Sequence, residues 1–381
     1  MNNYIIPIEV GIIIFPIIAL LITLPYLIYE YHKYGSISFL RTSIVYSFLL
    51  YILIAYLIVI LPLPSIEEVN DLTTPIMQLH PFNFISDFIN KCSVNLTDIN
   101  SYIIIIKNPA FYTVFFNLLL TMPFGIYLKY YFKCSTIKTI FFTFILSMFF
   151  EITQLTGIYG IYPRPYRLFD IDDLIINTLG GGLGAILAPI LCHYLPNRDQ
   201  IDEMAYIKGT KVSPLRKLLS FCFDYLFIII ITILVNNFFN WNFELMIILI
   251  SINWFIIIPV LTNGNTIGKR ILQIKMQTTK ANNNKIKLYQ YIIKYVLFYF
   301  LYIYSINIVI WMATFLTPNN DIMSQLIISI AISAIIIYDI AVTLNIFINS
   351  FIKKEELFYE RISNIKDISI IKIPDNEKQE I

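Results

Sequence analysis

Nine runs of roughly 20 predominantly apolar residues constrain this sequence more than any other feature, because a helix of that length spans the hydrocarbon core of a bilayer. Inside a bilayer, a helix is the structure in which a single segment satisfies all its own backbone hydrogen bonds. The sequence therefore predicts an all-α, polytopic transmembrane helix bundle with about nine spans. The runs cover residues 4–28, 40–62, 110–131, 137–156, 173–195, 218–236, 243–261, 290–314 and 324–348.

The composition supports a membrane protein and argues against several other classes. The residues are 57% hydrophobic and 14% charged, and the mean hydropathy is +0.71. A net charge of +2 gives no reason to expect a nucleic-acid partner. The four cysteines are widely spaced without a paired pattern, which indicates neither a disulfide framework nor a metal site. No cofactor is predicted.

Basic residues gather in alternate loops and set the expected orientation. Lys and Arg concentrate on the cytoplasmic side of membrane proteins. The loop at 63–109 lies on the opposite side and is acidic. We therefore expect a multi-pass protein of the bacterial cytoplasmic membrane, with the N-terminus outside, the C-terminus inside and the first run retained as a helix. The basic segments are 32–41, 129–138, 198–217, 269–287 and 353–354.

A polar stretch after the fifth run divides the chain. We expect a five-helix membrane module at residues 1–196, a cytoplasmic linker at 197–214 and a four-helix membrane module at 215–350. The charged segment 351–381 is interpreted as a loosely attached cytoplasmic tail. The two modules show no evident internal repeat, so an inverted-repeat transporter is not favoured.

Polar residues recur at helical spacing in the fourth and fifth runs. Ser147, Glu151 and Gln154 share one helix face, as do Asp173 and Asn177 with the glycines that follow them. An ionised carboxylate at the bilayer centre costs about 2.5–3.5 kcal/mol even on the lenient scale, so these faces point into the bundle. We expect one group near the outer surface, here named the polar layer: Asn117, Glu151, Gln154, Arg167, Asp170, Asp173 and Asn177.

Two interpretations of the polar layer stay open. Buried polar groups on facing helices can simply hold a bundle together through hydrogen bonds, and we favour that interpretation for Asn117 and Ser147. Charges of both signs suggest a ligand instead, and we favour that for Glu151 with Arg167 and the aspartates. Asp172 is interpreted as a solvated interface residue.

Residues 5–195 resemble the VanZ-like family of bacterial membrane proteins. The ordered combination that carries the resemblance is Asn117…Pro123-Phe-Gly125, Glu151-xx-Gln154 and Arg167-xx-Asp170-x-Asp172-Asp173-xxx-Asn177-xx-Gly180, preceded by HPFNFI at 80–85. The founding type of the family is associated with low-level resistance to glycopeptide antibiotics such as teicoplanin. The resemblance supplies neither a reaction nor a mechanism.

GNTIGKRILQIKM, residues 264–276, is the unusual stretch of the second module. It lacks the G-x-x-x-x-G-K-[ST] spacing of a phosphate-binding loop. It resembles instead an element of the RDD family, and the similarity extends over about residues 210–350. The polar residues that this resemblance singles out are Arg216, Lys217, Asp224, Gly264, Thr266, Gly268, Lys269, Asp339 and Thr343.

Two aspartates of this module, Asp224 and Asp339, lie within apolar runs and need partners. We expect Lys217, Arg216 or Lys269 to pair with Asp224 and Asp339. The loop is interpreted as a cytoplasmic turn in which Lys269 anchors the chain on the positive side. The resemblance implies cation transport or export, and that implication is an analogy.

The leading functional hypothesis is a protein that binds membrane lipids or lipid-linked envelope precursors at the outer leaflet and affects glycopeptide susceptibility. One alternative is a proton- or cation-coupled transporter that uses the intramembrane carboxylates. The other is an intramembrane acid–base enzyme acting on a lipid-linked substrate. Enzymatic activity is the less favoured expectation, because no nucleophile with a histidine partner is evident in the sequence.

The orientation predicts which positions an impermeant maleimide can reach in intact cells. We expect Cys92 in the acidic loop to react, and a cysteine introduced at Asn283 to react only after the cells are opened. Labelling at position 283 in intact cells would overturn the orientation.

Overall fold

The computed structural model describes residues 2–86, 109–239, 241–279, 285–316, 322–349 and 356–373, so Cys92 and Asn283 lie outside the described residues. Within these ranges, eight helices are long and apolar enough to cross a membrane, or nine if one bent pair counts as a single span. The expected helical membrane architecture is confirmed. Two compact units divide the chain: Met1–Leu24 with Ser38–Ile201, and Pro25–Ile37 with Asp202–Ile381.

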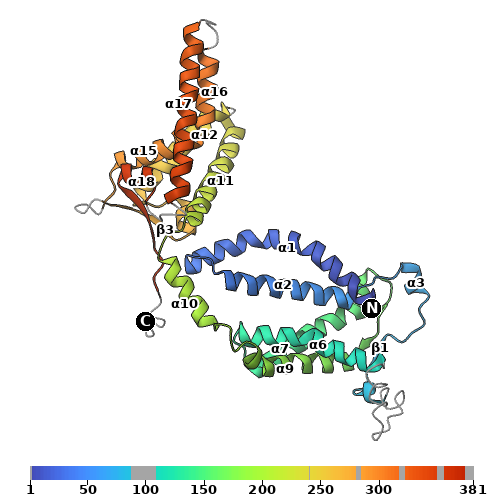
Figure 1. Ribbon diagram of the computed structural model, residues 1–381. Coiled ribbons are helices and arrows are strands. Elements are labelled where there is room, and N and C mark those ends of the chain that lie inside the picture. The colour runs from blue at the N-terminus through green and yellow to red at the C-terminus, as the bar shows by residue number, and fades with distance from the viewer. Residues whose placement is uncertain are drawn as a thin grey trace. The chain divides into compact units, whose positions relative to one another are not determined.

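Unit 1 is a bundle of long helices, in which α6, α7 and α9 lie side by side (Figure 1). Ser135 begins α7 by accepting a hydrogen bond from the backbone N–H of Lys138, and Asp170 begins α9 in the same way through Asp172. The helices are α1 (Asn2–Tyr34, as far as Leu24), α2 (Phe39–Ile60), α6 (Pro109–Tyr130), α7 (Thr136–Leu155) and α9 (Ile171–Leu191).

Short elements meet at the end of unit 1 where α9 begins. Strand β1 pairs in parallel with β2, with Met77 opposite Phe169 and Gln78 opposite Asp170. This pairing joins the segment after α2 to the segment after α7, directly ahead of α9. The elements are α3 (Ile66–Asn70), β1 (Met77–Gln78), α8 (Gly157–Gly160) and β2 (Phe169–Asp170).

Glycines bring the backbones of α6 and α9 into direct contact, as their spacing predicted. A Cβ atom added at Gly180 would lie 2.3 Å from the carbonyl oxygen of Leu118. One added at Gly184 would lie 2.1 Å from the carbonyl oxygen of Met122. Any side chain at these positions would therefore push the two helices apart.

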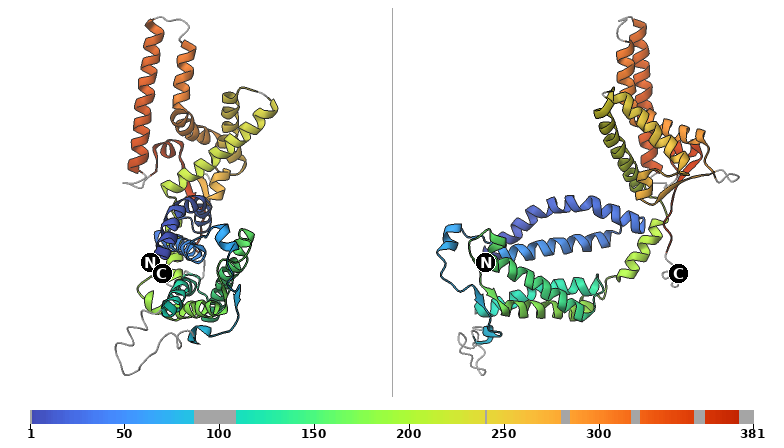
Figure 2. Two further views of the ribbon diagram at one scale, coloured as in Figure 1. Left: turned by 90° about the vertical axis from the view of Figure 1, so that its right-hand side faces the viewer. Right: turned by 180° about the vertical axis from the view of Figure 1, so that it is seen from behind.

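Unit 2 combines four apolar helical segments with a small two-stranded sheet. Figure 2 shows α16 and α17 running side by side beyond the rest of this unit. The long elements are α11 (Pro214–Phe239), α12 (Phe243–Ile252) continuing through η1 (Asn253–Ile257) into α13 (Ile258–Leu261), α15 (Leu288–Tyr295) continuing into η2 (Val296–Ile303), α16 (Ser305–Leu316) and α17 (Ile322–Phe347). The others are α10 (Arg198–Gly209, from Asp202), α14 (Ile267–Ile271), β3 (Ile274–Thr278), α18 (Phe358–Ser363) and β4 (Ile365–Ser369).

The run at 290–314 differs from the single straight span that its composition suggests. The helical pair Leu288–Ile303 and Ser305–Thr314 bends by 67°. The bend follows the π-helical segment η2, in which the regular hydrogen-bond ladder is interrupted.

The tail is not loosely attached, and that expectation was wrong. Strand β4 pairs antiparallel with β3, and the register runs from Ile274 opposite Ser369 to Thr278 opposite Ile365. Ile365 is fully buried and belongs to the main hydrophobic core of unit 2. The described part of the tail is thus an integral part of this unit.

The α6–α9 contact generates a stability prediction with an internal control. Gly184→Ala would place a methyl group against the Met122 carbonyl, and overpacking of this kind costs about 1–3 kcal/mol. Gly182→Ala is the control, because its nearest neighbour would be the Ile140 side chain at 3.4 Å. Thermal unfolding of the purified chain should show a lower midpoint for Gly184→Ala alone. Equal midpoints would contradict the close contact.

Candidate functional site

The polar layer of unit 1 forms where α6, α7 and α9 meet. Asn117 of α6 donates a hydrogen bond from Nδ2 to Asp173 Oδ1 of α9 at 2.6 Å. Asn177 donates from Nδ2 to Ser147 Oγ of α7 at 3.0 Å. Glu151 Oε2 accepts from the backbone N–H of Asp170 at 3.1 Å. Polar side chains of α6, α7 and α9, with the residue that begins α9, thus form hydrogen bonds between these three helices.

The layer has a buried floor and a more accessible rim. Glu151 and Asn177 are only 3% and 4% exposed, whereas Asn117, Asp170 and Asp173 are half-buried. The Oδ1 atom of Asn177 is buried and has no hydrogen-bond partner within the described ranges. A buried polar atom without a partner is costly, which makes it a candidate ligand contact.

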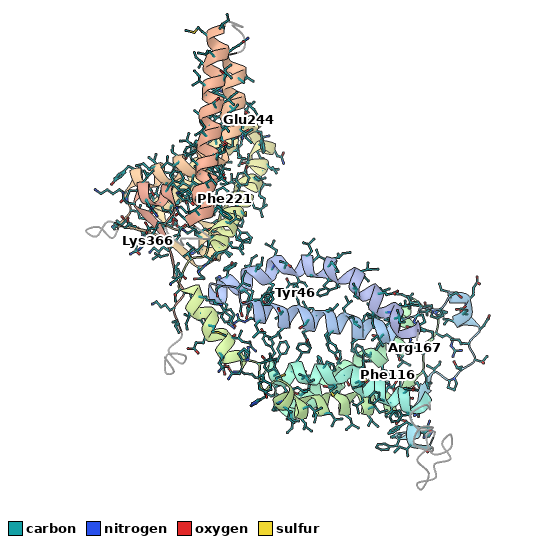
Figure 3. All side chains as sticks on the ribbon, viewed as in Figure 1. Tyr46, Phe116, Arg167, Phe221, Glu244 and Lys366 are labelled. Atoms are coloured by element: carbon teal, nitrogen blue, oxygen red, sulfur yellow. The ribbon has the colours of Figure 1, made fainter. Side chains whose placement is uncertain are left out.

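Arg167 and Gln154 turn toward the end of α2. Arg167 donates from Nη2 to the carbonyl of Leu61 at 2.6 Å, and Gln154 donates from Nε2 to the carbonyl of Val59 at 3.1 Å. Figure 3 shows Arg167 at the end of this bundle. Because only one of its N–H groups serves this contact, the half-buried Arg167 keeps further donors.

Asp172 is a buried structural residue, and its interpretation as a solvated interface residue was wrong. It is 3% exposed and accepts hydrogen bonds from the backbone N–H groups of Phe82 at 2.5 Å and Phe84 at 2.9 Å. Both phenylalanines belong to HPFNFI, so Asp172 fastens this segment beside the polar layer. The sequence pointed to HPFNFI but not to Asp172 as the residue that binds it.

Sequence reasoning also missed Arg164. Its Nη2 donates to the carbonyl of Thr74 at 2.6 Å, and its Nη1 donates to the carbonyl of Leu72. The only local signal is its place between two prolines in YPRPYR, residues 162–167. Arg164 thus ties the loop before α9 to the segment ahead of β1.

The described carboxylates of unit 1 lack the spacing that a metal site needs. In the described parts of the chain, no group of three or more His, Cys, Asp or Glu side chains could hold a metal ion. The layer combines the carboxyl groups of Glu151 and Asp173 with Arg167, whose charge acts on Asp173. Such a set suits a ligand that carries several hydrogen-bond donors.

In unit 2, Asp224 is satisfied by neutral donors. Its carboxylate accepts from Trp254 Nε1 at 2.9 Å, Thr266 Oγ1 at 2.6 Å and the backbone N–H of Gly268 at 2.7 Å. Gly268 must be small, because an added Cβ would lie 2.1 Å from the carbonyl oxygen of Ser220. Of the three expected basic partners, Lys217 pairs with Glu360 and Arg216 bonds to backbone carbonyls, so neither pairs with Asp224. Lys269 acts on the Asp224 carboxylate through its charge.

Arg216 is fully buried and bonds mainly to backbone carbonyls. It donates from Nε to Leu272, from Nη2 to Gln273, and from Nη1 to Gly35 and Gly209, at distances of 2.6–3.0 Å. One guanidinium therefore ties together three segments of unit 2 that are distant in sequence.

Lysines of unit 2 pair with the tail. Lys269 Nζ and Lys294 Nζ lie 2.8 and 3.1 Å from the two carboxylate oxygens of Asp367. Lys217 Nζ lies 2.7 Å from Glu360 Oε1. Lys269 is buried and its charge is paired inside the unit, while its expected role as a positive-side anchor stays a prediction.

The lysines determine the ionisation of Asp367. Burial by itself would raise the pKa of this carboxyl, but the charges of Lys269, Lys294 and Lys217 outweigh burial and hold the pKa well below its usual range. Asp367 therefore stays ionised and neutralises the lysines around it.

Within the described part of unit 2, Gly264, Asp339 and Thr343 lie outside the ion pairs that the lysines form with the tail. Gly264 adopts φ of +94° and accepts from the backbone N–H of Met276 at 3.0 Å. Thr343 donates to the Asp339 carbonyl at 2.7 Å and contacts the Tyr302 hydroxyl at 3.0 Å. Asp339 Oδ1 has no hydrogen-bond partner among the residues that the structure describes.

Two family models match the chain. The one described as VanZ/LLP1 matches residues 48–192, and the one described as the RDD family matches residues 212–325. The chain thus carries a VanZ-like domain followed by an RDD domain, as the two resemblances predicted. The polar layer lies inside the first match and Asp224 inside the second. No curated protein and no solved structure matches the chain significantly.

The ion pairs of the tail generate a prediction for Asp367→Asn. This change leaves Lys269 and Lys294 buried without their carboxylate, which costs about 3–5 kcal/mol in comparable buried pairs. Asp199→Asn is the control, because the Lys133–Asp199 pair is exposed and such pairs contribute less than about 1 kcal/mol. Chemical unfolding of the purified chain measures the change in the free energy of unfolding for both variants.

The lowered pKa of Asp367 predicts that the free energy of unfolding depends on pH. Because the pKa of Asp367 is lowered in the folded chain, the ionised carboxylate makes its full contribution to stability above about pH 4. That contribution declines as the pH falls further. The wild type should lose stability over that range more steeply than Asp367→Asn. Identical slopes would contradict the role of this carboxylate.

Proposed function

We propose that the VanZ-like domain of this chain, which an RDD domain follows, binds the headgroup of a membrane lipid or lipid-linked envelope precursor in the polar layer. Binding takes place at the outer leaflet of the bacterial cytoplasmic membrane and changes susceptibility to glycopeptides such as teicoplanin. The match to the two families supports an integral membrane protein. The link to glycopeptides rests on the resemblance to the VanZ-like family.

One observation carries the proposal. Asn117, Asp170 and Asp173 of the layer are half-buried, and Asn177 Oδ1 is buried and has no hydrogen-bond partner within the described residues. An unpaired buried acceptor costs free energy, and a hydrogen bond from a bound ligand would remove that cost. A ligand hydroxyl or amine that enters from the rim would satisfy it.

The charges favour a headgroup with donors and an anionic oxygen. Asp173 Oδ1 already accepts from Asn117, and the rest of its carboxylate is available for ligand donors. Arg167 has further N–H groups beyond the one on Leu61, and these suit a phosphate oxygen. The close packing of α6 and α9 makes the layer rigid.

A transporter is the second candidate, and one feature favours it. Thr139, Thr143 and Ser147 follow one another at four-residue spacing below Glu151, and all three are fully buried. A row of hydroxyls could conduct protons along α7. Thr139 and Thr143, however, donate to carbonyls of the preceding turn at 3.1 and 2.8 Å, so their protons are already engaged. We therefore favour binding over transport.

An acid–base enzyme is the third candidate. Glu151 and Asp173 face the same layer, as a general acid and base would. We place this function last because no serine or cysteine nucleophile with a histidine partner is evident in the sequence.

Charge-neutralising substitutions test the proposed function. Asp173→Asn keeps an acceptor for Asn117 but removes the charge, so the fold should persist while headgroup binding weakens. We expect a loss of about tenfold or more, because a hydrogen bond to a charged group is worth about 1.5–3 kcal/mol. Glu151→Gln and Arg167→Gln should act in the same direction. The measurement is teicoplanin susceptibility of a sensitive bacterial host that produces each variant.

Asp71→Asn is the matched control, since Asp71 is an exposed carboxylate outside the polar layer. Each variant must be present in the membrane at the wild-type amount. If the host's teicoplanin susceptibility changes by the same amount with each of the three layer variants as with the wild type, the polar layer has only a structural role.

A further inference from the structure

A cleft lies at the other end of α9, away from the polar layer. It has a volume of about 400 Å³ and is bounded by the ends of α6 and α9 and by residues that lead into α10. Ligand sites commonly have volumes of about 300–1,000 Å³. The polar layer lies at the start of the 21-residue α9, and a helix of that length rises about 30 Å. The two sites therefore face opposite sides of the membrane.

The polar lining of the cleft supplies hydrogen-bond donors. Lys129 uses Nζ for one bond, to Thr136 Oγ1 at 3.4 Å, and an ammonium group has three donors. Asn197 Oδ1 accepts from the backbone N–H of Gln200 at 2.9 Å, and Gln200 Oε1 accepts from that of Asn197 at 3.0 Å. Because these bonds use the amide oxygens, they leave the two NH₂ groups for another partner. His193 adds a ring that can donate.

The rest of the lining is apolar and ordered. Ala188 is buried, and Tyr130 is fixed by a hydrogen bond from its hydroxyl to the Pro196 carbonyl at 2.7 Å. Pro189 and Leu195 complete an apolar wall beside the donors. Among the residues that the structure describes, no Asp or Glu lines the cleft. A cation and several donors beside an apolar wall suit an anionic group attached to a hydrocarbon chain.

We infer that this cleft binds a phosphate group, presented by an anionic phospholipid of the leaflet opposite the polar layer or as free phosphate. Lys129 provides the charge, and the amide groups of Asn197 and Gln200 orient the phosphate oxygens. The neighbouring basic residues Lys138 and Arg198 attract anions to this end of unit 1.

Cys192 lines the cleft and is a free thiol, so it can report occupancy. In the full chain with Cys92, Cys134 and Cys222 replaced by serine, we would measure the rate of maleimide labelling of Cys192. The protein is held in maltoside micelles in phosphate-free buffer. Phosphatidylglycerol, inorganic phosphate or diacylglycerol is then added separately. Diacylglycerol has the acyl chains without the phosphate.

We expect phosphatidylglycerol to slow the labelling of Cys192 and diacylglycerol to leave it unchanged. Lys129→Gln with His193→Gln should raise the half-protective concentration about tenfold or more, as the loss of hydrogen bonds to a charged group predicts. Lys133→Gln is the control, because Lys133 pairs with Asp199 and does not line the cleft. It should retain full protection.

The three additions separate the sources of the phosphate. Protection by phosphatidylglycerol alone identifies a lipid, and equal protection by inorganic phosphate identifies the free anion. Both results support a phosphate site. Equal protection by diacylglycerol, protection that survives Lys129→Gln with His193→Gln, or no protection by any addition would overturn the inference.

Discussion

The backbone contact between α6 and α9 is the constraint on which the polar layer of unit 1 depends. Gly180 and Gly184 let α9 approach the carbonyl oxygens of Leu118 and Met122, where any Cβ would collide. That approach allows Asn117 to reach Asp173 across the interface at 2.6 Å. In a membrane, where apolar side chains gain little by leaving lipid, packing of small residues and interhelical hydrogen bonds supply the specificity. The same glycines therefore determine both the packing and the position of the polar groups.

Unit 2 solves the problem of buried charge differently. Arg216 is surrounded by carbonyl oxygens, and Asp224 accepts three hydrogen bonds from neutral groups. Lys269 and Lys294 are neutralised by Asp367, which the tail delivers through the pairing of β4 with β3. Breaking such a pair leaves an uncompensated charge, so the tail cannot be removed without cost. The RDD domain of this chain is thus completed by residues beyond the matched range 212–325.

The sequence predicted the features that depend on local pattern. Apolar length identified the spans, and three- and four-residue spacing identified the glycine face of α9. Contacts between distant segments could not be derived in this way. Lys217 and Glu360 are 143 residues apart, and no periodicity relates them. Asp172 was misjudged because its partners are backbone N–H groups of Phe82 and Phe84, which carry no side-chain signal. The bend after η2 could not be predicted because the η2 segment contains neither Pro nor Gly, the usual sequence signals of a kink.

The central claim is that the polar layer holds a headgroup and does not merely join helices. An experimental structure of the full chain in nanodiscs made from bacterial envelope lipids tests it most directly. The account predicts headgroup density within about 3 Å of Asn177 Oδ1 and the Asp173 carboxylate, continuous with acyl chains at the outer leaflet. A layer whose polar atoms are all satisfied by their own side chains or by water, with no headgroup at saturating lipid, would contradict it.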